Sequence, residues 1–190
     1  NNGKVTTLPS VNTIADGTAV KTPGSNIFPY IKKNLDDIIT VEDDELIVAF
    51  LDMVENHKMI VENSGLLTVA ALKHLGVKDK RVVSILSGGN MDVITMSSVV
   101  QQGLIFRDRI FTVSVLLPDK PGELAKVSQT LADVQGNVIK LEHNQFVTTN
   151  RSAAVELRIT LECFGTEHKE QIIAALEKKG YKPRIVRTMI

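Results

Sequence analysis

The chain has 190 residues, of which 43% are apolar and 23% charged, and its 22 basic residues balance its 22 acidic ones. This composition is that of a globular protein, without the basic surface that nucleic acid or an anionic membrane requires. No apolar run approaches the ~20 residues that span a membrane. We therefore expect neither nucleic acid nor membrane as a partner. The single cysteine, Cys163, predicts a reducing cytoplasm, and the four histidines show no metal-ligand spacing.

The first part of the chain alternates strand-like and helix-like segments. It opens on Asn1-Asn2-Gly3, without Met or an apolar signal segment, so we expect it to be part of a longer protein. Residues 1–26 are rich in Gly, Pro, Thr, Ser and Asn and predict loop. Asp36–Val41 is a short run of strand type, and Arg81–Leu86 is typical of a parallel strand buried on both faces.

Helices are expected between these strands. Thr40 and Asp43 resemble a capping box that opens a first helix. A second helix should run from Asn63 to Leu75, with Gly76 at its C-terminal end. A third helix should end at Gly103. The strands are too few to close an α/β domain, so we expect an incomplete portion of one.

The remainder begins with a half-buried strand. Phe111, Val113, Val115 and Leu117 share one face of it. A turn at Pro121-Gly122 leads into an amphipathic helix that Gly136 stops. The further elements expected are strands at Asn137–Phe146 and Ala153–Cys163, a helix at Glu167–Lys179 and a strand at Tyr181–Val186. This βαββαβ order predicts the ferredoxin-like α+β fold.

Two turns could bind ligands. Ser87-Gly88-Gly89-Asn90 follows a predicted parallel strand, where open α/β sheets bind ligands, and Ser87 supplies a hydroxyl. At Gly122, bare backbone N–H groups at a helix start favour an anionic group. Both turns could instead be purely structural. Glu62 could start a helix or serve a function, and Asp16-Gly17 is most simply a turn.

The ferredoxin-like part should need a partner. Two helices cover one face of such a sheet, and the other face and the edges need cover. A second copy of the domain is the natural source of that cover, which predicts a homo-oligomer.

Four motifs resemble a known enzyme family in their order and spacing. They are Thr13–Gly17, Asp36–Val41, Glu62–Gly65 and Ile85–Asn90. They resemble the C-terminal part of pyridoxal-phosphate-dependent threonine dehydratases (threonine ammonia-lyases), and residues 105–190 resemble an ACT regulatory domain. The resemblance implies that residues 1–104 are an incomplete C-terminal portion of a tryptophan synthase β-like (fold type II) catalytic domain.

The resemblance also implies roles for single residues. Ser87 is similar to the hydroxyl that faces the pyridine nitrogen of pyridoxal phosphate, and the Gly17 backbone to the one that packs against its ring. Glu62 and Gly88 would lie close to the cofactor. A neutral hydroxyl need not keep that nitrogen protonated, which suits β-elimination better than transamination. The effector residues implied for the ACT domain are Asp119, Gly122, Leu124, Asn137, Val138 and Ile139.

The family's Schiff-base lysine and its glycine-rich phosphate loop match no segment of this chain. We therefore expect no catalytic residue here, no metal, and no pyridoxal phosphate bound to the chain by itself. The complete enzyme, called the parent enzyme below, would deaminate L-threonine to 2-oxobutanoate and ammonia. Its ACT domain would bind an amino-acid effector, isoleucine or valine. Two alternatives are a stand-alone, dimeric amino-acid-binding ACT module and a serine dehydratase or racemase parent.

Overall fold

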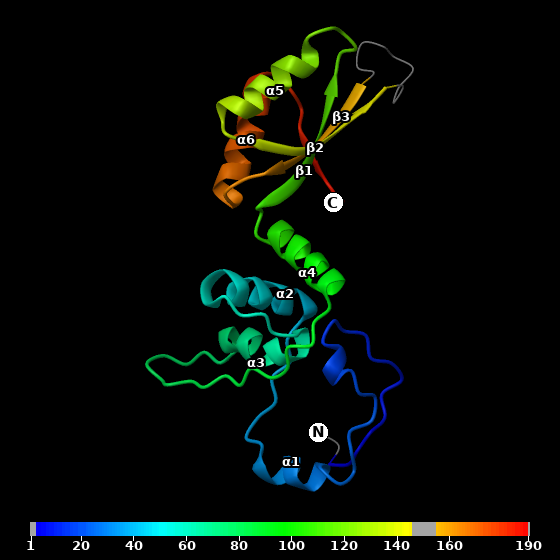
Figure 1. Ribbon diagram of the computed structural model, residues 1–190, viewed down its shortest axis with the longest axis vertical. Coiled ribbons are helices and arrows are strands. Elements are labelled where there is room, and N and C mark those ends of the chain that lie inside the picture. The colour runs from blue at the N-terminus through cyan, green and yellow to red at the C-terminus, as the bar shows by residue number, and fades with distance from the viewer. Residues whose placement is uncertain (1–2, 146–154, 190) are drawn as a thin grey trace. The chain divides into compact units, whose positions relative to one another are not determined.

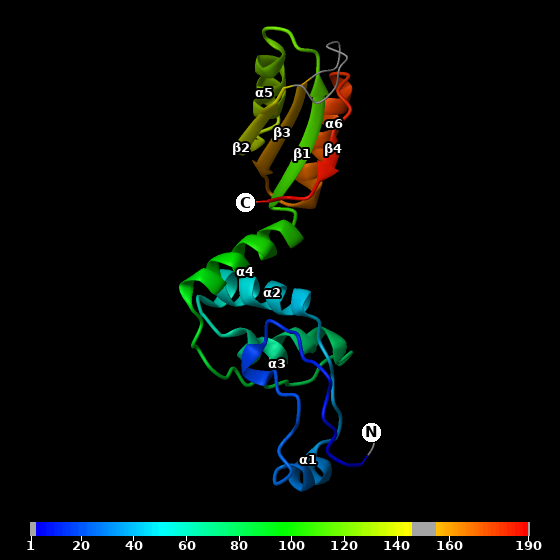
Figure 2. The ribbon, with the colours of Figure 1, turned by 90° about the vertical axis from the view of Figure 1, so that its right-hand side faces the viewer.

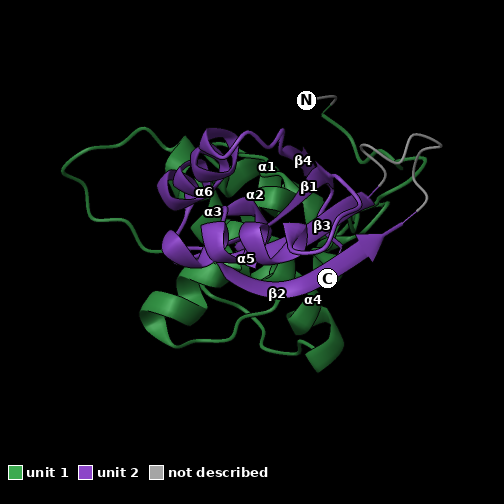
Figure 3. Cartoon of the chain, turned by 90° about the horizontal axis from the view of Figure 1, so that it is seen from above, with its two compact units in different colours: residues 1–103 green, residues 104–190 purple. Residues whose placement is uncertain are grey.

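The chain divides into two compact units, residues 1–103 and residues 104–190, coloured separately in Figure 3. The structure, a computed structural model, describes residues 3–145 and 155–189. The described part of the first unit consists of helices and loops, whereas the second unit holds a four-stranded sheet and two helices.

The first unit packs short helices around one apolar core. Its regular helices are α1 (Phe28–Asn34), α2 (Asp43–Asp52), α3 (Leu67–Ala70) and α4 (Val93–Phe106). Shorter helical turns lie at Asp16–Thr18, Met53–His57, Asn63–Leu66 and Ala71–His74. The buried side chains of the core include Leu46, Phe50, Met53, Val61, Leu66 and Val99.

The capping box of α2 lies two residues beyond the expected position. Glu42 is the N-cap, and its carboxylate accepts the Glu45 backbone N–H while the Glu45 carboxylate accepts the Glu42 N–H at 2.8 Å. The prediction of a Thr40–Asp43 box is therefore wrong. The Asp43 carboxylate instead accepts the Thr13 hydroxyl at 2.6 Å, which ties the N-terminal segment to the start of α2.

Neither strand predicted in this unit is present among the described residues. Asp36–Val41 and Arg81–Leu86 are both irregular. Most apolar side chains of the second stretch face solvent, with Val83 88% and Ile85 71% exposed, whereas Leu86 packs against the core. A strand forms only beside another strand, and the described part of this unit offers none. The Thr68 hydroxyl instead holds this stretch by donating to the Ile85 carbonyl at 2.9 Å.

Gly103 lies inside α4 rather than at its end, because the helix continues to Phe106. A Cβ at Gly103 would lie 2.6 Å from Leu51 Cδ1 and 3.3 Å from Ile47 Cγ2. The glycine therefore allows α4 to approach α2 closely, which a pattern of helix-stop residues does not reveal.

The second unit has the expected βαββαβ order. Its elements are β1 (Ile110–Leu117), α5 (Glu123–Asp133), β2 (Asn137–Asn144), β3 (Val155–Glu162), α6 (Thr166–Lys178) and β4 (Arg184–Val186). The strands pair antiparallel in the order β2-β3-β1-β4 (Figure 2). The ferredoxin-like prediction is confirmed, although β4 begins at Arg184 rather than Tyr181. Phe146 and Ala153, expected ends of β2 and β3, lie outside the described residues.

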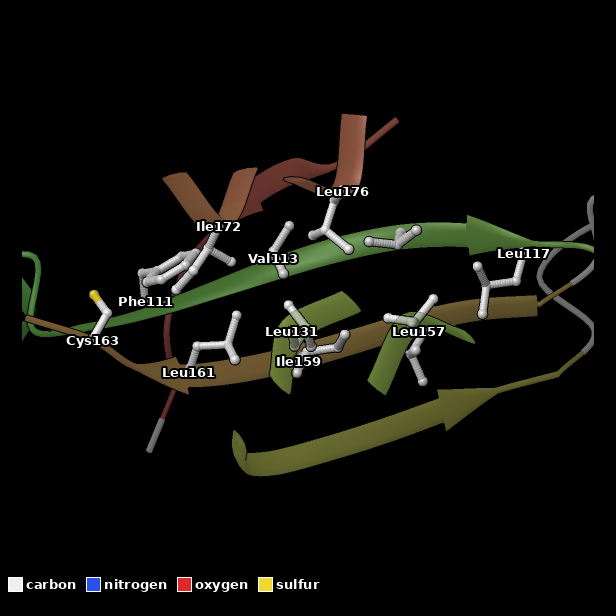
Figure 4. Packing of buried hydrophobic residues seen from close by; sticks show 12 residues of the cluster. Phe111, Val113, Leu117, Leu131, Leu157, Ile159, Leu161, Cys163, Ile172 and Leu176 are labelled. Carbon is white, nitrogen blue, oxygen red and sulfur yellow. The ribbon is translucent and has the colours of Figure 1, made fainter. Parts of the chain in front are cut away.

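Helices α5 and α6 cover one face of the sheet (Figure 1). Leu131 from α5 and Leu176 from α6 pack with Val113 and Ile159 of the two central strands (Figure 4). Cys163 is buried in the same core, and its Sγ donates to the Asp108 carbonyl at 2.8 Å. Side-chain alternation along β1 and β3 thus builds the core of this unit.

Replacing Ile159 by alanine should lower the free energy of unfolding of this unit by about 2–5 kcal/mol, because the fully buried side chain would leave a cavity. Ile185→Ala is the matched control, since Ile185 on β4 is 50% exposed. It should lower that free energy by less than half as much. Denaturant unfolding of the full chain measures both, and equal losses would contradict this description of the core.

Glu45 should make the stability of the first unit pH-dependent. Its carboxylate lies 2.7 Å from Lys73 Nζ and 2.9 Å from His74 Nε2. The Lys73 hydrogen bond is the main cause that lowers the pKa of Glu45 from 4.5 to about 2. A carboxyl whose pKa is lowered on folding stabilises the fold above its unfolded pKa, and this contribution disappears as the pH falls through the folded pKa.

Glu45→Gln keeps an acceptor for the capping box and removes the charge. At neutral pH the unchanged chain should therefore unfold at a higher temperature than this variant. The difference should shrink between pH 4.5 and pH 2, the window that the two pKa values define. Thermal unfolding followed by circular dichroism measures it, and a difference that does not vary with pH would refute the ion-pair explanation.

Candidate functional site

Three of the four residues expected at the cofactor site converge in the first unit. Gly88 has a φ of +80°, and a Cβ there would lie 2.2 Å from Glu62 Oε1. A Cβ at Gly17 would lie 3.5 Å from the same oxygen. Glu62 Oε2 accepts the Asn90 backbone N–H at 3.2 Å. Segments far apart in the sequence thus meet around the Glu62 carboxylate.

Ser87 reaches this cluster through its backbone. A Cβ at Gly65 would lie 1.9 Å from the Ser87 carbonyl oxygen, so only glycine lets the two segments meet. The Ser87 side chain is exposed, and its hydroxyl makes no hydrogen bond to the described residues. Sequence reasoning gave Gly65 no role of its own, although it ends the Glu62–Gly65 motif.

A cleft of about 410 Å³ opens beside Glu62. Asp16, Asn63 and Asp92 also line it, and its lining among the described residues contains no lysine or arginine. Asn63 is 4% exposed; its Nδ2 donates to the Ile14 carbonyl at 3.1 Å, while its Oδ1 has no partner among those residues. The lining of the cleft is therefore acidic, and one of its residues, Asn63, holds a buried acceptor without a partner among the described residues.

Asp92 starts α4 beside this cleft. Its Oδ1 accepts the backbone N–H groups of Ile94 at 2.9 Å and Thr95 at 3.0 Å, and its Oδ2 accepts the Thr95 hydroxyl. The hydrogen bond from the Thr95 side chain is the main cause that holds the pKa of Asp92 below its usual range. The carboxylate therefore stays ionised at neutral pH, where it favours the helix N-terminus.

The described residues of this site fit only part of pyridoxal phosphate. The exposed Ser87 hydroxyl suits one edge of a flat ring. The space that a Cβ would take is filled by Ser64 at Gly17 and by Glu62 at Gly88. The cleft offers carboxylates and no cation, which does not suit a phosphate dianion. The residues present do not complete a cofactor site.

A second site lies at the start of α5 in the second unit. The predicted effector residues Asp119, Gly122 and Leu124 line a pocket of about 280 Å³ there. Gly122 is the N-cap of α5 with a φ of +89°, and a Cβ on it would contact nothing within 4 Å. The helix has no side-chain cap, and its first N–H, that of Glu123, donates to the Lys120 carbonyl at 3.4 Å. The N–H groups of Leu124 and Ala125 are left for a ligand. Leu117 and Val155 add apolar side chains to the lining of this pocket, and His143 adds a polar one.

The other predicted effector residues, Asn137, Val138 and Ile139, do not line this pocket. Asn137 pairs with Glu162 at the end of the sheet opposite to the Leu117–Val155 pair. Within one chain the Asn137–Ile139 segment therefore lies apart from the pocket at Gly122, and its part in an effector pocket shared by two copies stays a prediction. Because β2 runs antiparallel to β3, its second half lies beside the pocket and its first half does not. His143 was missed because only the strand register shows its position.

Among residues 3–145 and 155–189, no helix is long and apolar enough to cross a membrane. The same residues contain no group of three or more His, Cys, Asp or Glu side chains that could hold a metal ion.

Both units match known protein families. Residues 1–88 match the family described as pyridoxal-phosphate dependent enzyme, and residues 111–180 match the ACT domain. The first match supports the expected fold type II segment, and the second agrees with the βαββαβ sheet. A stand-alone ACT module is not favoured, because most of the first unit matches an enzyme family.

Individual relatives are similar along nearly the whole chain. It is 37% identical over 181 residues to the L-threonine ammonia-lyase of Geobacter sulfurreducens and 34% identical over 175 residues to that of Thermotoga maritima. These alignments cover 94% and 92% of the chain but 45% and 44% of the relatives. The chain therefore spans about half the length of the curated relatives it matches.

Among solved structures, the processed threonine deaminase isoform 2 of Solanum lycopersicum is 29% identical, with a TM-score of 0.48 over 51% of this chain and 29% of that one. From the family matches and the sequence relatives we conclude that residues 1–88 are a segment of the pyridoxal-phosphate-dependent enzyme type and residues 111–180 an ACT domain, in a chain that is similar along nearly its whole length to part of L-threonine ammonia-lyases.

Proposed function

We propose that the chain is the C-terminal portion of a threonine ammonia-lyase that converts L-threonine to 2-oxobutanoate and ammonia. Residues 1–104 would belong to the catalytic domain and residues 105–190 to the ACT regulatory domain. The observation that carries the proposal is the meeting of Gly17, Glu62 and Gly88 from separate segments. The names of the sequence relatives support the substrate. A cytoplasmic location stays a prediction.

Each residue of the cofactor cluster would have a defined task. Bound pyridoxal phosphate supplies an electron sink for the substrate. The Ser87 hydroxyl would hydrogen-bond the ring nitrogen without adding a charge, and the Gly17 backbone would pack against the ring. Gly88 would let the Glu62 carboxylate approach the turn closely. The Glu62 carboxylate, held by the Asn90 N–H, would fix the turn that carries Ser87. Because the cleft lacks a cation among the described residues, the phosphate ligands and the catalytic lysine would come from another part of the parent enzyme.

The chain by itself should not form 2-oxobutanoate from L-threonine with added pyridoxal phosphate, whereas the parent enzyme that contains it should. In the parent enzyme, Ser87→Ala should lower the turnover rate. Ser84→Ala is the matched control, because the Ser84 hydroxyl donates to the Thr68 carbonyl at 3.4 Å and is not in the cofactor cluster. A coupled assay for 2-oxobutanoate measures the turnover of the chain alone, of the parent enzyme and of its two variants. An inactive parent enzyme would refute the function, and turnover by the chain alone would refute its incompleteness.

We further propose that the effector pocket is completed by a second copy of the chain. Strand β2 is an edge of the sheet, and its apolar residues Val138, Ile139 and Leu141 are partly exposed. Antiparallel pairing of two β2 edges would bring Asn137–Ile139 of one copy beside the His143 end of the other. This pairing would reunite the two groups of predicted effector residues.

The pocket chemistry favours an aliphatic amino acid. The open N–H groups at the start of α5 would bind the α-carboxylate. The Asp119 carboxylate lies within reach of the same pocket and would suit an α-ammonium group. Leu117, Leu124 and Val155 would contact the aliphatic side chain, which supports isoleucine or valine.

Calorimetric titration of the chain should detect binding of isoleucine or valine, and Gly122→Trp should abolish the heat because the indole would fill the pocket. Gly180→Trp is the matched control. Gly180 has a φ of +87° and open space around it, like Gly122, but lies after α6 and outside the pocket. It should carry the same backbone strain and leave binding intact. Equal behaviour of the two variants would show that the pocket is misplaced.

A further inference from the structure

The second unit has another hollow, of about 540 Å³, where α5 ends and α6 begins. It shares no lining residue with the pocket at Gly122. The chemistry of the side chains around it differs from that of the effector pocket and points to another class of ligand.

An aromatic platform forms one wall of this hollow. Phe164 is 79% exposed, and its ring stacks on His168 with centroids 4.9 Å apart and planes 16° from parallel. His168 is buried, and its Nδ1 accepts the Phe164 backbone N–H at 3.1 Å. Its Nε2 therefore carries the proton and donates to the Val134 carbonyl at 2.6 Å. These bonds hold the His168 ring in place beneath Phe164.

Two carboxylates without a cation lie beside the platform. Asp133 is the last residue of α5, where the helix dipole disfavours a negative charge. Its Oδ1 accepts only the Gln129 amide at 2.8 Å. Glu167 lines the hollow from the first turn of α6. Neither carboxylate forms an ion pair with the described residues. A cation in this hollow would relieve the unfavourable charge at the end of α5.

We propose that this hollow binds a guanidinium group. A guanidinium is a flat, weakly hydrated cation that stacks on an aromatic face and gives paired hydrogen bonds to carboxylates. Phe164 supplies the face, and Asp133 and Glu167 supply the acceptors. An ammonium group would neutralise the carboxylates but would not stack flat on the exposed Phe164 ring. The guanidinium belongs either to a small molecule or to an arginine of another chain.

The test uses agmatine, which carries a guanidinium but no α-carboxylate and so does not mimic an amino-acid effector. It is titrated at millimolar concentrations into the ¹⁵N-labelled full chain. The amide signals of residues 133–135 and 164–171 should shift. Putrescine, with ammonium groups only, should bind several-fold more weakly. Phe164→Leu and Glu167→Gln should each weaken agmatine binding about threefold to fivefold.

Glu170→Gln is the matched control, since Glu170 is an exposed α6 carboxylate that does not line the hollow. It should leave agmatine binding unchanged, and thermal unfolding should confirm that all variants fold. A dilution series of the unliganded chain separates the two sources. Shifts of the same amides on dilution, lost in Glu167→Gln, would identify an arginine of a second copy and support the proposal.

Equal affinity for putrescine and agmatine, or no shift with either, would overturn the proposal. Because the probe lacks the amino-acid group, such a failure would leave the effector pocket untouched. Conversely, failure of isoleucine and valine to bind at Gly122 would not bear on the guanidinium site.

Discussion

The pairing of β1 with β3 along all eight residues of each strand is the constraint on which the second unit depends. It places the buried side chains of both strands under α5 and α6. It also separates the two candidate ligand sites. The Leu117–Val155 end leads to the turn at Gly122, and the Ile110–Glu162 end leads to Phe164. One register therefore gives the domain two chemically different ends, one suited to a carboxylate and one to a cation.

The first unit depends on close backbone contacts rather than on a sheet. The contact of Gly65 with the Ser87 carbonyl, and of Gly88 with Glu62, joins segments that have no ladder between them in the described residues. A side chain at Gly65 would force the backbone to move, because its Cβ would meet the Ser87 carbonyl. A side chain at Gly88 would displace the Glu62 carboxylate and strain a backbone with a φ of +80°. The surroundings of Ser87 are thus fixed by two glycines, whereas its hydroxyl is left available.

Sequence periodicity predicted the second unit well because its signals are local. Alternation along Val155–Glu162 and the helical stripe through Val127 and Leu131 depend on neighbours in the chain, and both elements formed as expected. The prediction of a strand at Arg81–Leu86 was wrong for a physical reason. An apolar run shows that a segment can be buried, but not whether a neighbouring strand is there to pair with it. The strand register also decides whether Asn137 and Gly122 of one chain lie together or apart, which no local pattern contains, so the shared effector pocket stays a prediction.

The burial of Cys163 has a chemical consequence for the whole chain. Desolvation raises the pKa of its thiol, and the sulfur donates its proton to the Asp108 carbonyl. Since the thiolate is the reactive form, native protein is protected from oxidants and electrophiles at its single sulfhydryl. Oxidation of Cys163 is thereby confined to molecules in which the core of the ACT domain has already unfolded.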